Sequence, residues 1–463
     1  YHRSPAASNL RACGREPSKL AIVVAPARTI ATRALHRVIH DDAWAAPALD
    51  AELKRSEPNR ADAALATQIV YGTLRVVPEL QEALAAHARR AIKVDDWTNA
   101  ALLGAAFQLL HLERVPAHAV VDDTVSLVSA KRGKRVAGFA NALLRKLSIA
   151  RPASPSPPRA VAVAPWLRES LRASIGAEHT EQLLRVGGEP VSIDLRVRAG
   201  VERDDVEQAI REARPEASVN KTSLSSAGLR VSGAGDPREL PGYTEGAFSV
   251  QEEGAQLIGE LLDAQPGERV LDACAGRGGK TIRLVEAVGD QGSVVATDLH
   301  EHRVEQIEGE LARLQLSADR LETACVDWTV GCGGVEGDFD RVLVDAPCTG
   351  LGTLRRRPEI LLRTEPDDAA RMGQTQAAIL RNAATLVRPG GVLLYAVCSP
   401  LSDEGSEVAR RADLPGFEPC LARAAGLKSL YFDSDGRLDL GPWVSGAGPW
   451  ADAYQCYMWV NVG

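Results

Sequence analysis

Short apolar segments alternate with helix-forming segments over the second half of the chain, and this order constrains the fold more than any other feature. The apolar, β-rich runs are residues 270–271, 293–297, 341–344 and 391–397, and the helix-forming stretches between them are residues 281–288, 301–314 and 367–386. Strands that alternate with helices are typical of a doubly wound α/β sheet with parallel strands. Ligands of such sheets bind beyond the carboxyl ends of the strands. We therefore predict that residues 251–463 form an α/β domain whose functional residues follow its strands.

The part of the chain before this alternating region predicts two further folded domains. Residues 28–150 are rich in helix formers, and Leu103, Phe107 and Leu110 recur there at the spacing of a core-facing helix stripe. This segment is therefore expected to form an all-α domain. Residues 160–250 mix helix and strand signals and are expected to form a small α+β domain.

The segments outside these domains carry no periodic apolar pattern. Residues 151–159 are rich in Pro and Ser and are expected to be a linker. Residues 1–27 are expected to be a disordered or mistranslated leader, although they faintly resemble a targeting segment. The sequence thus predicts a multidomain chain in which three folded domains follow a leader.

Composition excludes some classes of protein and permits a polyanionic partner. No apolar run approaches the ~18 residues that a membrane span needs. The net charge is −7, but residues 1–150 hold 21 basic and 14 acidic side chains, so a basic segment is joined to an acidic remainder. Chance asymmetry on solvated surfaces explains the same counts equally well.

The eight cysteines have the spacing of neither a zinc site nor a disulfide framework. No two of them form a C-x-x-C pair, no His cluster accompanies them, and all but Cys13 lie beyond residue 270. A structural metal site and a disulfide-stapled secreted domain are therefore disfavoured. We expect reduced thiols, no metal, no membrane association and a cytoplasmic location.

A glycine-rich loop joins the first strand of the alternating region to the helix that follows. It reads Cys274-Ala275-Gly276-Arg277-Gly278-Gly279-Lys280, and glycines at this place let backbone N–H groups approach a ligand closely. Acids stand near the ends of three successive strands, at Asp272, Asp298 and Asp327. Asp298 is placed to accept hydrogen bonds from ribose hydroxyls, and Asp327 to lie near an adenine amine. Each acid alone is more often a helix cap or a turn residue, but the three together favour an adenosine-containing cofactor.

Two later strands each run into a cysteine. One continues as Asp345-Ala-Pro-Cys348, and the other as Val397-Cys398-Ser399. A lone cysteine of this kind is more often an inert, buried small side chain, but two at the carboxyl ends of strands in one sheet face the same crevice. A thiolate there can add to carbon 6 of a cytosine, after which carbon 5 can attack the methyl group of a sulfonium. Asp345 is suited to hold or protonate ring N3, and the second thiol to help remove the carbon 5 proton.

At these residues the chain resembles the cytosine-5 RNA methyltransferase superfamily and, more narrowly, the bacterial ribosomal RNA small-subunit methyltransferase B family. The motifs that carry the resemblance are Asp345–Gly350, Val397–Ser399, Arg355–Glu359, Phe248–Gln251, Pro116–Ala119 and Gly138–Arg145. The resemblance runs from about residue 28 to the C-terminus. It implies a NusB-like helical RNA-binding domain, a small α+β domain and a Rossmann-like methyltransferase domain that uses S-adenosylmethionine.

The resemblance also implies roles for individual residues. Cys398 would be the nucleophile that bonds cytosine, Cys348 the cysteine that releases the product, and Asp345 the acid that contacts both cofactor and base. The residues implied to bind S-adenosylmethionine are Cys274, Ala275, Gly276, Arg277, Gly278, Gly279, Lys280, Asp298, Arg303, Asp327 and Asp345. The target base would have to leave its stack to reach these groups.

RNA contacts are implied for two basic clusters. Those beside the proposed active site are Arg355, Arg356 and Arg357, and those of the helical domain are Lys131, Arg132, Lys134 and Arg135. Basic side chains of this kind bind the phosphate backbone, although a solvated loop between helices explains the second cluster as well.

The expected function is therefore methylation of carbon 5 of a cytosine in small-subunit ribosomal RNA, by a monomer and through a covalent cysteine–cytosine intermediate. Two alternatives stay open: an RNA-binding ribosome-assembly factor with weak or lost activity, and cytosine-5 methylation of a transfer RNA. The chain departs from the family pattern where Gly276 and Arg277 replace Ala and Pro, where Val397 replaces Thr, and where Gly405 follows Glu404 in place of Asn.

Overall fold

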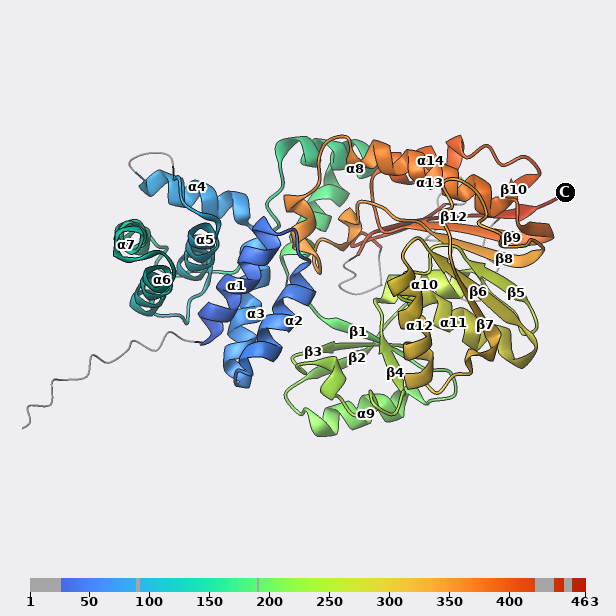
Figure 1. The fold of residues 1–463 in the computed structure, drawn as a ribbon, viewed down its shortest axis with the longest axis horizontal. Coiled ribbons are helices and arrows are strands. Elements are labelled where there is room, and N and C mark those ends of the chain that lie inside the picture. The colour runs from blue at the N-terminus through green and yellow to red at the C-terminus, as the bar shows by residue number, and fades with distance from the viewer. Residues whose placement is uncertain (1–25, 89–91, 190, 421–436, 445–451) are drawn as a thin grey trace, which may run out of the picture. The chain divides into compact units, whose positions relative to one another are not determined.

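The computed structural model describes residues 26–88, 92–189, 191–420, 437–444 and 452–463. These residues belong to two compact units (Figure 1): the first holds the chain up to Val70 together with Gln81–Ser156, and the second holds Tyr71–Leu80 and Pro157–Gly463. The leader expected at residues 1–27 lies outside the described residues, except for its last two, which begin the first helix.

The described N-terminal region is helical, and the all-α prediction for it is confirmed. Its helices are α1 (Pro26–His40), α2 (Ala45–Ser56), α3 (Arg60–Arg75), α4 (Val77–His87), α5 (Asp96–His111), α6 (Ala117–Arg132) and α7 (Lys134–Ile149). Helix α5 is buried along most of its length, and Asp95 caps its start by accepting a hydrogen bond from the Thr98 N–H at 3.1 Å. A Cβ atom at Gly104 would lie 3.2 Å from Leu35 and 3.4 Å from Ile69, so the absent side chain lets α1 and α3 approach α5 closely.

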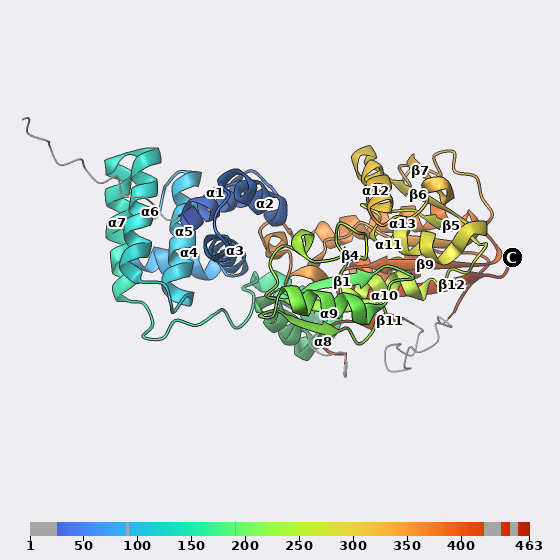
Figure 2. The same cartoon turned by 90° about the horizontal axis from the view of Figure 1, so that it is seen from below.

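The segment after the linker forms the expected small α+β fold. It begins with α8 (Pro165–Gly188), and its four-stranded antiparallel sheet has the order β2-β3-β1-β4. These strands are β1 (Ile193–Val197), β2 (Ser218–Lys221), β3 (Gly228–Ser232) and β4 (Phe248–Val250). Helix α9 (Arg203–Ala213) covers one face with Val206 and Ile210, and β1 also lies beside helix α10 (Glu253–Leu261) (Figure 2). The middle domain predicted at 160–250 thus shares a compact unit with residues 251–463.

A buried ion pair joins the small sheet to helix α11. Arg196 of β1 donates from its Nη1 atom to Glu286 of α11 (Gly279–Val288) at 2.5 Å, and the two side chains are 2% and 1% exposed. Removal of one partner leaves an uncompensated charge in the interior, which typically costs about 3–5 kcal/mol. We therefore expect Arg196→Met to lower the free energy of unfolding of this unit by about that amount, measured by urea denaturation.

Two further variants separate this effect from general damage. The double variant Arg196→Met/Glu286→Gln is expected to recover most of the loss, because the remaining partner is then neutral. Arg211→Met breaks an exposed pair with Glu207 and is expected to cost less than about 1 kcal/mol. A loss below about 1 kcal/mol for Arg196→Met would contradict the assignment.

The large sheet has the order β10-β12-β9-β8-β5-β6-β7, with β11 paired to β12. Its strands are β5 (Arg269–Asp272), β6 (Ser293–Asp298), β7 (Leu321–Cys325), β8 (Phe339–Asp345), β9 (Val387–Val397), β10 (Phe417–Pro419), β11 (Leu438–Leu440) and β12 (Tyr454–Asn461). The pairs β7–β6, β6–β5, β5–β8 and β8–β9 are parallel, as predicted. The sequence predicts no strand at the other side of the sheet, where β12 runs antiparallel to β9, β10 and β11. Residues 456–460 of β12 are apolar, but among the described residues no helix separates β10, β11 and β12. The alternation of strands and helices therefore does not extend to these strands.

Helices cover both faces of this sheet because alternate strand residues point to opposite sides. On one face, Val270 and Leu343 lie in a core with residues of α10, α11 and α12 (Glu301–Arg313). On the other, Val342 and Tyr395 lie in a core with residues of α13 (Asp368–Ala384) and α14 (Ser406–Arg411). The carboxyl ends of the five parallel strands therefore all lie on the same side of the domain, at the ends of the strands (Figure 1).

Candidate active site

Cys348 and Cys398 lie together just beyond the ends of β8 and β9. The two strands are parallel neighbours, and the two Sγ atoms are 3.3 Å apart. The loops that carry them are in close contact, since the Gly352 N–H donates to the Cys398 carbonyl at 2.9 Å. A Cβ atom at Gly352 would lie 2.8 Å from that carbonyl oxygen and 2.0 Å from the Ala453 oxygen. Any side chain at position 352 would force these segments apart.

The surroundings of the two thiols favour different protonation states. The hydrogen bond with Cys348 lowers the pKa of the Cys398 thiol, and the charges of Arg357 and Lys280 act in the same direction, against burial and Asp345. The same hydrogen bond, burial and the nearby Glu404 raise the pKa of Cys348 well above its usual value. Cys398 is therefore the readier of the two to become a thiolate, which is the nucleophilic form of cysteine.

Asp345 at the end of β8 is paired with Lys280 in the first turn of α11. The Lys280 Nζ atom donates to Asp345 Oδ2 at 2.5 Å, and the side chains are 12% and 30% exposed. Burial alone would lower the pKa of Lys280, but the charge and hydrogen bond of Asp345 outweigh burial and raise it. The ammonium group therefore stays charged beside the two thiols, where it favours negative charge on sulfur.

The glycine-rich loop bends sharply between β5 and α11. Gly276 and Gly278 have φ angles of +57° and +83°, which other residues rarely adopt. A Cβ atom at Gly278 would lie 2.8 Å from Ile307 of α12, whereas one at Gly276 would meet nothing within 4 Å. The loop is therefore tight against α12 at Gly278 and open at Gly276, and the exposed Arg277 lies between them.

Hydrogen bonds hold this loop against the end of β6. The Ala275 N–H donates to the Thr297 carbonyl at 2.8 Å, and the Gly276 N–H donates to Asp298 Oδ2 at 3.1 Å. Arg303 of α12 donates to both oxygens of the same carboxylate at 3.4 and 3.5 Å. The glycine-rich loop, Asp298 and Arg303 therefore lie together at the end of β6. These are residues that the resemblance implies to bind the cofactor. Burial raises the pKa of Cys274 at the start of the loop, so its thiol stays protonated.

Acceptor groups gather around the start of α11. Asp272 is 1% exposed and accepts a hydrogen bond from Thr281 Oγ1 at 2.7 Å, and burial raises its pKa to about 7. A Cβ atom at Gly279 would lie 3.6 Å from the amide nitrogen of Gln251. The amide oxygen of Gln251 is buried and has no hydrogen-bond partner among the described residues. A buried acceptor without a partner is costly, so this position suits a ligand that donates hydrogen bonds.

Asp327 has a local role in the structure. It lies two residues beyond β7 and is exposed, and its Oδ1 atom accepts hydrogen bonds from the N–H of Thr329 at 2.9 Å and from its hydroxyl at 2.6 Å. These two bonds lower its pKa. Asp327 is thus a turn-capping residue here, and its contact with an adenine amine stays a prediction.

The three arginines after Cys348 have different environments. Arg355 is 8% exposed, and burial lowers its pKa. Arg356 forms an ion pair with the buried Asp452. Arg357 is exposed and close enough to Cys398 to lower the pKa of that thiol. Arg357 is therefore the member of the cluster best placed to meet a polyanion at the thiols.

The basic cluster of the helical region lies where α6 meets α7. Lys131, Arg132, Lys134 and Arg135 are all exposed. The Arg132 Nε atom donates to Asp95 at 2.8 Å, and Lys131 Nζ lies 5.7 Å from the centre of the Trp97 ring. The cluster is a solvated basic surface, and its contact with RNA stays a prediction.

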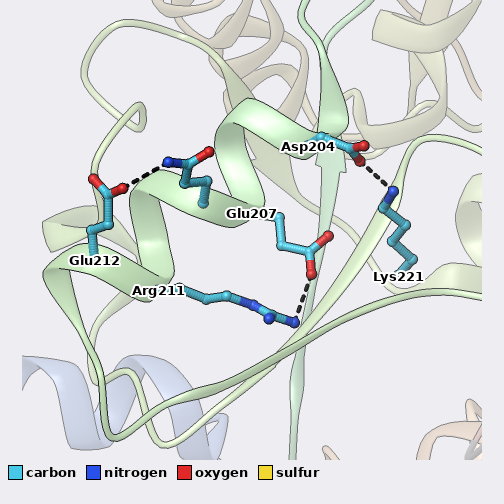
Figure 3. A pocket seen from close by; sticks show the side chains of 6 residues that line it. Asp204, Glu207, Arg211, Glu212 and Lys221 are labelled. Carbon is cyan, nitrogen blue, oxygen red and sulfur yellow. Dashed lines mark hydrogen bonds and ion pairs between the residues drawn. The ribbon is translucent and has the colours of Figure 1, made fainter.

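A surface pocket on the middle domain lies apart from the cysteines and the glycine-rich loop. Figure 3 shows that its charged side chains face one another across α9 and β2. Arg211 pairs with Glu207 at 2.7 Å, Lys221 pairs with Asp204, and Gln208 bonds to Glu212. These groups satisfy one another, so the pocket does not resemble a built ligand site.

Within the described ranges, no three or more His, Cys, Asp or Glu side chains are grouped so that they could hold a metal ion. No helix in the described part of the chain has both the length and the apolar character to cross a membrane.

Comparison with protein families gives two matches. The model described as "16S rRNA methyltransferase RsmB/F" matches residues 259–413, and the model described as "NusB family" matches residues 25–148. The first covers most of the large sheet and both cysteine loops, and the second covers the helical region.

Individual proteins resemble the chain over most of its length. "Probable ribosomal RNA small subunit methyltransferase B" of Bacillus subtilis is 33% identical over 430 residues, which cover 90% of this chain and 95% of that protein. "Ribosomal RNA small subunit methyltransferase B" of Pseudomonas putida is 34% identical over 413 residues, which cover 87% and 93%.

Solved structures share the fold. The crystal structure of PH0851 has a TM-score of 0.79 at 23% identity and covers 96% of this chain and 100% of that one. The crystal structure of NSun6 from Pyrococcus horikoshii with SFG has a TM-score of 0.55 at 15% identity and covers 65% and 98%.

Proposed function

Because the chain belongs to the ribosomal RNA small subunit methyltransferase B family, we propose that it methylates carbon 5 of a cytosine in small-subunit ribosomal RNA with S-adenosylmethionine. The observation that carries the proposal is the 3.3 Å separation of the Cys348 and Cys398 sulfurs at the ends of two adjacent strands. A mechanism of addition and elimination needs a nucleophile and a second group that takes up a proton. Two thiols at this distance supply both.

The groups around the glycine-rich loop fit S-adenosylmethionine. This cofactor supplies a methyl group on a positively charged sulfur and carries an ammonium group and ribose hydroxyls, all of which suit acceptors or anionic surroundings. The carboxylate of Asp298 would accept from the ribose hydroxyls. The unpartnered amide oxygen of Gln251 would accept from a donor of the cofactor. Gly276, where a Cβ atom would meet nothing, leaves the loop open toward its ligand.

The geometry supports separate roles for Cys398 and for the Lys280–Asp345 pair during the addition step. The Cys398 thiolate forms a bond to carbon 6 of cytosine, and the electrons of the C5=C6 double bond move toward carbon 5 and the ring. A proton at ring N3 stabilises the adduct. The Lys280–Asp345 pair holds a proton between two groups 2.5 Å apart and is the proposed source or anchor of that proton.

Elimination completes the reaction after carbon 5 has gained its methyl group. Once the Cys398 sulfur is bonded to carbon, the hydrogen bond and the negative charge by which Cys398 raises the pKa of Cys348 are lost, and burial and Glu404 still raise it. In the proposed sequence, Cys348 gives up its proton to solvent at this stage. The Cys348 thiolate then accepts the proton from carbon 5. The C–H electrons re-form the C5=C6 bond, and the electrons of the C6–S bond return to Cys398.

The proposal is tested by bisulfite mapping of RNA after incubation with the purified chain and S-adenosylmethionine. Unmodified small-subunit ribosomal RNA is the substrate, and transfer RNA of the same source is the comparison. We expect one or a few cytosines of the ribosomal RNA to become resistant to bisulfite conversion. Resistance confined to transfer RNA, or methyl incorporation at atoms other than cytosine carbon 5, would contradict the proposal.

A further inference from the structure

Glu404 is a fully buried carboxylate that contacts the residues following both cysteines. It lies in the short 3-10 helix Ser402–Glu404 and is 0% exposed. Its Oε1 atom accepts from the Thr349 N–H at 2.7 Å, and its Oε2 atom accepts from the Thr349 hydroxyl at 2.6 Å and from the Ser399 hydroxyl at 2.5 Å. Thr349 directly follows Cys348, and Ser399 directly follows Cys398.

The surroundings leave this carboxylate little freedom to move. Gln376 of α13 donates to Glu404 Oε1 at 3.4 Å and to the Pro347 carbonyl at 2.8 Å, so it also touches the Cys348 loop. The Tyr395 hydroxyl donates to the backbone carbonyl of Glu404 at 2.5 Å. A Cβ atom at Gly405 would lie 2.1 Å from the Gln455 side chain, which explains why the smallest residue follows Glu404.

These contacts matter because the two cysteines belong to different strands. The backbone pairing of β8 and β9 ends at Asp345 and Ala396, so the last ladder pair lies before both sulfurs. The separation of the sulfurs then depends on how the two loops are joined beyond the sheet. Glu404 joins the loops through a side chain on each, beside the Gly352–Cys398 backbone hydrogen bond and the 3.4 Å contact between the Thr349 and Ser399 hydroxyls.

We propose that Glu404 is a positioning residue that holds Cys348 and Cys398 at the separation needed for addition and elimination. The inference rests on the proposed function for its meaning in catalysis, but the separation of the thiols can be measured without RNA. Glu404 itself touches neither sulfur. It positions the sulfurs through Thr349 and Ser399, and its charge separately raises the pKa of Cys348.

The test compares Glu404→Ala with Glu404→Gln. Dibromobimane, which becomes fluorescent when it joins two nearby thiols, reports the proximity of Cys348 and Cys398 directly. We expect Glu404→Ala to lower the rate of this cross-link by about tenfold or more. We expect Glu404→Gln to restore most of it, because the amide oxygen still accepts from the Thr349 N–H and the amide NH₂ donates to the two hydroxyl oxygens.

Two further measurements separate positioning from general destabilisation. The rate of covalent adduct formation with RNA is expected to fall with the cross-linking rate, while the Kd for S-adenosylmethionine stays within about twofold. Glu260→Ala is the matched control, because Glu260 is also largely buried and accepts from a serine, Ser225 at 2.7 Å, but lies on α10. It is expected to leave the cross-linking rate unchanged.

If Glu404→Ala fails to fold, the same cross-linking measurement is made on Ser399→Ala. It removes one hydrogen bond of the junction and is expected to slow the cross-link by several-fold. A folded Glu404→Ala, or in its absence Ser399→Ala, that cross-links at the unaltered rate would overturn the inference. If the unaltered chain methylates no cytosine, the proposed function is contradicted. A slower cross-link in Glu404→Ala would still support the positioning role in that case.

Discussion

Replacement of Cys398 by alanine is expected to abolish methyl transfer to RNA while leaving S-adenosylmethionine bound with nearly unchanged affinity. Loss of the nucleophile in enzymes that form covalent intermediates lowers kcat by on the order of 10⁴ to 10⁶-fold. Most of the residues proposed to bind the cofactor follow β5 and β6, so the loss of one sulfur at the end of β9 is expected to leave them in place. The expected signature is a kcat below detection with a Kd for the cofactor within about twofold.

This outcome is measured by transfer of a labelled methyl group and by calorimetric titration with the cofactor. Cys332→Ala is the matched control, because that half-buried thiol lies away from the two catalytic candidates, beside the Asn382 carbonyl and the Thr385 hydroxyl. It is expected to retain methyl transfer. An active Cys398→Ala variant would show that another group attacks the base.

Replacement of Cys348 by alanine is expected to trap a covalent complex between protein and RNA. Addition through Cys398 and methylation of carbon 5 need no proton acceptor at position 348, but elimination does. The carbon 5 proton then has no thiolate to receive it, and the C6–S bond persists. A slow band that survives denaturant is expected on a gel, with overall turnover reduced by about 10²-fold or more.

The double variant Cys348→Ala/Cys398→Ala is the control for the trapped complex. It lacks the sulfur that forms the bond and is expected to give no band. If Cys348→Ala turns over at the unaltered rate without accumulating an adduct, a group other than Cys348 removes the proton. A stable adduct formed by the double variant would show that the bond involves a different residue.

Much of the fold was predictable because buried parallel strands leave a clear pattern. Four of the five parallel strands, β5, β6, β8 and β9, contain a short apolar run, whereas β7 carries Glu322 and Thr323 and lacks one. The geometry of the sheet then brings Asp298, Asp345 and Cys398 to one edge. Strand β12 was not predictable in the same way, because it lies outside the alternation of strands and helices, although its residues 456–460 are apolar.

The limits of the site prediction have a physical cause as well. The basic run predicts RNA contacts for Arg355, Arg356 and Arg357 alike, whereas Arg355 is buried and Arg356 is paired with Asp452. Tertiary packing buries a charge where it supplies a partner, and the local sequence does not report this. Glu404 was noticed only as a neighbour of Gly405. Its hydrogen bonds to Thr349 and Ser399 join segments about 50 residues apart in sequence, and no local pattern reports such a junction.

The central claim is that the Cys398 sulfur bonds to carbon 6 of a cytosine. The most direct measurement uses RNA in which 5-fluorocytidine replaces cytidine, because fluorine takes the place of the proton that must leave and the adduct cannot be released. After digestion, mass spectrometry locates the modified peptide. The account predicts a peptide containing Cys398 that carries a fluorinated, methylated cytidine. An adduct on the peptide containing Cys348, or methylation of ordinary RNA with no adduct from the fluorinated RNA, would contradict it.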